Sequence, residues 1–186
     1  MAGACAVPAG RRQGAMAAAA RLFGSLWSAA VDFALPPRCP CCGLIVDGDH
    51  RFCATCWQKL EFLGAPACVC CALPLPHDVG PDALCGECHR RPPTFDRAAA
   101  AVAYGEVARS VALRLKYGRR PGVACAMAGQ VVRLVGALPS DALVAAVPLH
   151  RWRLLRRGYN QALLIARGVA ERAGRECVPD LLVRTR

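Results

Sequence analysis

The hydrophobic pattern of the chain predicts helices and strands only in its second half. Apolar residues recur at helical spacing over 107–118, 124–138 and 159–174, and glycines close the first and last of these segments. Residues 97–106 have the pattern of a strand that ends in a turn at Gly105. The wholly apolar run over 141–150 is typical of a buried parallel strand, and 177–186 begins another extended segment. This alternation predicts an α/β fold with a parallel sheet that has few strands.

The first half of the chain divides into three parts. We expect residues 1–15 to be disordered and residues 16–37 to hold an N-terminal amphipathic helix, which the prolines at 36 and 37 end. Arg21 and Asp32 interrupt this segment, so it predicts neither a membrane span nor a signal peptide, and we expect a cytoplasmic protein. Residues 38–93 have too little aliphatic bulk for a core and therefore fold around something else.

The spacing of the cysteines in residues 38–93 indicates what this block folds around. The chain has 13 cysteines, and eight of them form four C-x2-C pairs separated by 10, 11 and 13 residues. Two residues between cysteines let both sulfurs face one point on a tight turn, as tetrahedral Zn²⁺ requires. The spacing thus predicts a double zinc ribbon with two zinc ions. The expected ligands are Cys39, Cys42, Cys53, Cys56, Cys68, Cys71, Cys85 and Cys88.

Several alternatives remain open at this point. Disulfides, free buried thiols or a redox pair would also use cysteines, although one redox motif does not need four copies. The pairs can combine in sequence, first with second and third with fourth, or in a cross-braced order. Cys41 and Cys70 each precede the second ligand of a pair, and we expect them to be bystanders because a tetrahedral site is already full. His50, His77 and His89 are nearby, but no cysteine is missing for them to replace.

Charge draws attention to a second segment. The formal net charge is +11, which favours an anionic partner such as phosphate or nucleic acid. The segment "PLHRWRLLRRGYNQ", residues 148–161, follows the apolar run and is expected to be a basic loop before a helix. Backbone N–H groups at a helix N-terminus and arginine side chains both bind phosphate. The candidate residues for a pyrophosphate-binding loop are Arg153, Arg156, Arg157 and Gly158, and a solvated basic loop is the alternative.

These motifs together resemble a known family. The double cysteine ribbons, "RPPTFDRAAAAVAY", "LKYG", "VPLHRWRLLRRGYNQALLIA" and "DLLVRTR" are similar to the ComF family over residues 20–186. The resemblance implies a phosphoribosyltransferase-like domain over 94–186 behind the zinc module, with a link to competence and DNA uptake. It also implies Mg²⁺ and phosphoribosyl pyrophosphate as ligands of a complete domain.

The chain departs from that family at its C-terminal end. The acidic pair and the Thr/Gly-rich loop that hold the ribose phosphate in such domains are absent, so we expect a C-terminally truncated domain without transferase activity. Two hypotheses follow. One is a phosphoribosyl-pyrophosphate-binding domain, or its remnant, on a zinc module. The other is a non-enzymatic zinc-ribbon module that binds single-stranded DNA, the DNA-uptake machinery or another protein.

Overall fold

The computed structural model describes residues 36–78, 80–136 and 138–184. The chain divides into two units, Met1–Pro37 and Arg38–Arg186, and the description below concerns the second. The segments expected to be disordered (1–15) and helical (16–37) lie outside the described residues, apart from residues 36 and 37. In the described part of the chain no helix is long and apolar enough to cross a membrane.

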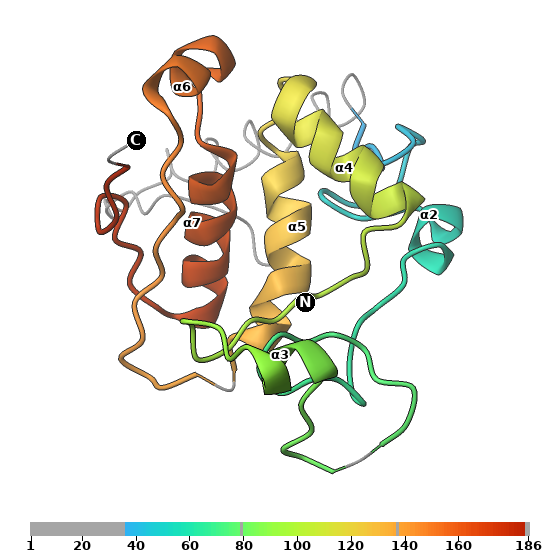
Figure 1. The fold of residues 1–186 in the computed structure, drawn as a ribbon. Coiled ribbons are helices and arrows are strands. Elements are labelled where there is room, and N and C mark those ends of the chain that lie inside the picture. Colours follow the sequence, from blue (N-terminus) through green and yellow to red (C-terminus); the bar gives the residue numbers. More distant parts are fainter. Residues whose placement is uncertain (1–35, 79, 137, 185–186) are drawn as a thin grey trace, which may run out of the picture. The chain divides into compact units, whose positions relative to one another are not determined.

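Helices are the regular elements of the described residues (Figure 1). Two short ones, α2 (Ala54–Gln58) and α3 (Gly86–Arg90), belong to the cysteine-rich block. They are followed by α4 (Glu106–Tyr117), α5 (Val123–Val131) with the 3-10 turn η1 (Val132–Leu134), α6 (Arg151–Arg157) and α7 (Gln161–Ala173). The predicted helices over 107–118, 124–138 and 159–174 are confirmed as α4, α5 with η1, and α7.

The prediction of a parallel sheet is wrong. No strand forms in the described ranges, where β-pairing is limited to isolated bridges. The apolar run over 141–150 pairs at one position only, Val144 with Cys177, through the bonds Val144 N–H to Glu176 O and Val178 N–H to Val144 O. A parallel ladder would continue with Ala146 N–H to Val178 O and Asp180 N–H to Ala146 O, and neither bond forms in the described residues, so the pairing ends after one bridge. The expected strand at 97–106 is rich in alanine, a poor strand former, and pairs only at Val102 with Phe62.

The main hydrophobic core joins the cysteine block to the helices. Val107, Val111 and Leu115 follow one another at every fourth position of α4, so their side chains share one face. This face packs with Val123 and Ala124 of α5, and with Cys39, Cys56 and Leu60 of the cysteine block. Glycine is required at position 118, immediately after α4, because a Cβ there would lie 2.7 Å from the carbonyl oxygen of Arg114.

A second apolar cluster holds the last helices together. Helices α5 and α7 lie side by side (Figure 1), and Ala128 of α5, Val169 of α7 and Val135, which follows η1, form one buried cluster. Helix α7 begins at Asn160, whose side-chain oxygen accepts a hydrogen bond from Ala162 N–H, and ends at Gly174 in the left-handed conformation. The Asn160 amide also donates to the carbonyl oxygen of Val147, which fixes the entry to this helix.

Candidate metal centres

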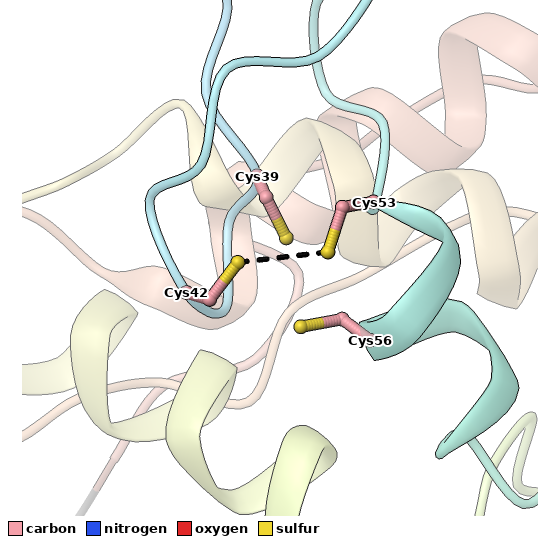
Figure 2. Close-up of side chains that lie close together, drawn as sticks. All are labelled: Cys39, Cys42, Cys53 and Cys56. Carbon is pink, nitrogen blue, oxygen red and sulfur yellow. Dashed lines mark hydrogen bonds between the residues drawn. The ribbon is translucent and has the colours of Figure 1, made fainter.

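The first cysteine centre is assembled from a tight turn and a helix start. Cys39 and Cys42 lie on a turn closed by the hydrogen bonds Gly43 N–H to Cys39 O and Cys39 N–H to Leu44 O. Gly43 takes a φ of 84°, which suits glycine at the end of such a turn. Cys53 is the N-cap residue of α2, and Cys56 lies in its first turn. Figure 2 shows the four side chains pointing toward one another from these two segments.

The sulfur separations in this centre suit a tetrahedral metal. All four sulfur atoms lie within 4.8 Å of one another, and the Cys42 and Cys53 sulfurs are 3.6 Å apart (Figure 2). Zinc–sulfur bonds of about 2.3 Å in a tetrahedron place sulfur atoms about 3.8 Å apart. A disulfide would bring two sulfurs to about 2.05 Å. The described cysteines are all free thiols, so the spacing is that of metal ligands.

The second centre repeats the first. Cys68 and Cys71 lie on a turn with the bonds Ala72 N–H to Cys68 O and Cys68 N–H to Leu73 O, and Ala72 takes the positive φ of 59°. Cys85 is the N-cap of α3, and Cys88 lies in that helix. The Cys71 and Cys85 sulfurs are 3.7 Å apart, and again four sulfurs lie within 4.8 Å. The cysteines are therefore grouped in sequence order, and the cross-braced grouping does not occur.

Electrostatics give each centre one thiol that ionises easily. Burial alone would raise the pKa of the Cys39 thiol, but the backbone N–H groups of Cys42, Cys53 and Cys41 donate to its sulfur and lower the pKa to about 6. The backbone N–H groups of Cys71 and Cys85 likewise lower the pKa of Cys68 to about 6.

The last cysteine of each centre behaves in the opposite way. Burial raises the pKa of the Cys56 thiol, and the neighbouring cysteines raise it further. The pKa of Cys88 is raised for the same reasons. Four thiolates within one such site repel one another unless a cation compensates their charge. A divalent metal ion provides that compensation, so the donor set of each centre fits Zn²⁺.

The other cysteines and the histidines stand outside these groups. Cys41 and Cys70 are half-buried beside the first and second centres. Neither belongs to the group of four sulfurs beside it. Neither metal-ligating group found among the described residues includes His50, His77 or His89. Cys125 and Cys177 are half-buried elsewhere, and Cys5 lies outside the described residues.

The expected basic loop is a helix. Residues 151–157 form α6, and Gly158 ends it in the left-handed conformation with its N–H donated to Leu154 O. Arg153 and Arg156 are exposed, whereas the guanidinium carbon of Arg157 lies 5.2 Å from the centre of the Tyr117 ring. In the pattern "RWRLLRR" Arg151 interrupts the apolar face, so there is no continuous apolar stripe and sequence reasoning missed this helix. Phosphate binding by these four residues remains a prediction.

Comparison with known proteins supports the zinc assignment. The family model of the double zinc ribbon domain matches residues 30–89. The DNA utilization protein YhgH of Salmonella typhi is 28% identical over 159 residues, which are 82% of this chain and 67% of that protein. The proteins of the same name from Salmonella typhimurium and Escherichia coli K12 are 29% and 26% identical over 160 residues, with 82% of this chain and 67% and 68% of those proteins covered. No solved structure matches the chain.

The prediction of a double zinc ribbon is thereby confirmed. The matched residues contain all eight cysteines of the two centres. The similarity to DNA utilization proteins is distant, and at 82% of this chain it extends beyond the residues that the zinc-ribbon model matches.

Proposed function

We propose that this chain is a zinc-organised module that handles DNA. Two structural zinc ions, one bound by Cys39, Cys42, Cys53 and Cys56 and one by Cys68, Cys71, Cys85 and Cys88, order the cysteine block. The observation that carries the zinc part of this proposal is the convergence of four thiols in each of two groups. Four sulfur ligands fill a tetrahedral coordination sphere and leave no position for a reacting water, so these metals stabilise the fold rather than catalyse.

Charge supports DNA as the partner. Eight thiolates and two zinc ions leave a formal net charge of about +7 on a chain whose neutral-thiol charge is +11. A surplus of this size attracts the phosphate backbone of nucleic acid. The name of the relatives, DNA utilization protein, favours DNA among anionic partners. A role in DNA uptake by competent bacteria is the context that the sequence resemblance implies.

Titration with single-stranded DNA tests this function. Zinc-loaded full-length protein is added to a fluorescently labelled oligothymidine, and anisotropy is followed at several salt concentrations. We expect saturable binding whose affinity falls as salt rises, because binding releases counterions from the DNA. An absence of saturable binding at low ionic strength would exclude the DNA function and leave the zinc centres unaffected.

Phosphoribosyl pyrophosphate is the second candidate ligand, and one observation favours it. The Nε atom of Arg157 is buried without a hydrogen-bond partner among the described residues, so a ligand oxygen could satisfy it. Arg153, Arg156, Arg157 and Gly158 would then face the pyrophosphate, with Mg²⁺ as its counterion. Calorimetry with phosphoribosyl pyrophosphate and Mg²⁺, compared with pyrophosphate alone, tests this idea. Heat of binding that requires both the sugar phosphate and the metal would support it.

A further inference from the structure

Helix α6 is exposed to an unusual degree. None of its seven residues is buried, and six of them, Arg151 to Arg156, are exposed. The exposed fractions of Trp152 and Leu155 are 65% and 72%. A helix this short does not persist by its own backbone bonds. It is held at its ends instead, since the His150 ring nitrogen Nδ1 accepts a hydrogen bond from Trp152 N–H and Gly158 closes the C-terminus.

The charge on this helix is of one sign. Its residues include four arginines and no acidic side chain. The three ion pairs found among the described residues join Arg51 to Asp47, Lys59 to Glu106 and Arg90 to Glu87, so they leave α6 out. The exposed arginines Arg151, Arg153 and Arg156 are therefore available to an anionic partner.

Two arginines, Arg151 and Arg156, lie near the indole ring of Trp152. With about 100° between successive residues, Arg156 lies next to Trp152 on the helix surface and Arg151 lies between the two leucines. The guanidinium carbon of Arg151 is 5.9 Å from the centre of the indole ring. A flat aromatic ring among cations matches single-stranded nucleic acid, in which each base carries a π face and each nucleotide a phosphate.

We propose that α6 is the contact element for single-stranded DNA, with Trp152 stacked on one base and Arg151, Arg153 and Arg156 paired with neighbouring phosphates. This inference rests on the proposed function and names the surface that performs it. A membrane surface also attracts short basic helices with tryptophan and leucine. Such helices separate an apolar face from a charged face, whereas Arg151 divides the apolar face of α6. The observations thus favour DNA.

The experiment compares variants of the zinc-loaded full-length chain by oligothymidine anisotropy. Trp152→Ala should weaken binding about tenfold through the lost stacking contact, while Trp152→Phe should retain most of the affinity. Leu155→Ala is the matched control, because it removes an equally exposed apolar side chain of the same helix, and it should change affinity less than twofold. Arg153→Ala should lower the salt slope by about 0.7, while Trp152→Ala should leave that slope unchanged.

The outcomes separate the inference from the proposed function. If the native chain binds DNA and Trp152→Ala binds equally well, α6 is not the contact element and the proposed function stands. If the native chain does not bind, both ideas fail. If Trp152→Ala reduces binding to phosphatidylglycerol vesicles and leaves DNA binding unchanged, a membrane surface replaces DNA as the partner of α6. Far-UV circular dichroism of each variant verifies that the fold is kept.

Discussion

The hydroxyl group of Tyr159 donates a hydrogen bond of 2.6 Å to the backbone carbonyl oxygen of Leu115. Leu115 lies in the last turn of α4, where carbonyl groups have no N–H partner within the helix. Tyr159 lies 44 residues later, between α6 and α7. Together with the contact between Arg157 and Tyr117, this bond joins the segments "LKYG" and "RRGYNQ". The bond gives these two motifs a shared structural role.

Removal of this bond should destabilise the protein. Tyr159→Phe keeps the ring but leaves the carbonyl group of the buried Leu115 unpaired, which costs about 1–2 kcal/mol of unfolding free energy. Urea denaturation followed by circular dichroism measures the change. Tyr104→Phe is the control, since Tyr104 is 68% exposed, and its effect should stay within about 0.5 kcal/mol. Equal stability of the two variants would show that the Tyr159 bond makes no net contribution to the free energy of unfolding.

The packing of α7 against α5 depends on a glycine. A Cβ at Gly168 would lie 2.9 Å from the Cβ of Ala128, which is fully buried. Gly168→Ala should therefore lower the free energy of unfolding by about 1–3 kcal/mol, despite the better helix propensity of alanine. Gly129→Ala is the matched change in α5, with no atom within 4 Å of the added methyl group, and it should stabilise by up to about 1 kcal/mol. Urea denaturation of both variants tests the pair. Stabilisation by Gly168→Ala would mean that the helices separate easily.

Local patterns in the sequence were predictable, whereas contacts between distant segments were not. The helices were predictable because Val107, Val111 and Leu115 recur at every fourth position and thereby mark a buried face. Each half of a cysteine centre was predictable because two residues between cysteines define one local turn. The bond from Tyr159 to Leu115 left no signal, since it joins residues that only the tertiary fold brings together.

The failed predictions have a common physical origin. An apolar run such as 141–150 becomes a strand only if another segment pairs with it along its length, and Val144 meets Cys177 at a single position. At α6 the error was the opposite one, because a loop was predicted where the structure has a helix. Its order comes from the caps at His150 and Gly158 and not from a buried apolar face, so hydrophobic periodicity could not reveal it.

The zinc content of the protein should be two per chain. Purified without chelator and analysed by atomic emission, the native chain should contain two zinc ions, and Cys42→Ser and Cys71→Ser should each contain one. Cys41→Ser and Cys70→Ser are the controls, because these thiols adjoin the centres without joining the groups of four, and both variants should keep two ions. Loss of an ion from Cys41→Ser would show that Cys41 is a ligand.

The two zinc ions should contribute unequally to stability. Cys39 and Cys56 belong to the same buried cluster as Val107 of α4 and Val123 of α5, whereas among the described residues the apolar cluster of the second centre adds only Cys70 and Leu75 to its four ligands. Cys42→Ser should therefore lower the melting temperature of the helical signal by about 10 °C or more, since zinc binding at the first centre contributes several kcal/mol to the free energy of unfolding. The matched variant Cys71→Ser should lower it by a few degrees. Equal shifts in thermal melts at 222 nm would contradict this asymmetry.

Acid should release the zinc and loosen the fold within a defined pH range. Backbone amides lower the pKa of Cys39 and Cys68 from 9.0 to about 6, so the folded state favours both thiolates. The resulting stabilisation is complete above pH 9, shrinks as the pH falls toward 6 and is absent below it. A bound metal lowers both pKa values further, so zinc should stay bound at pH 7 and leave below about pH 6. Atomic emission after gel filtration at each pH measures the ions retained. Release at pH 8, or two ions retained at pH 4, would show that these thiolates do not control metal binding.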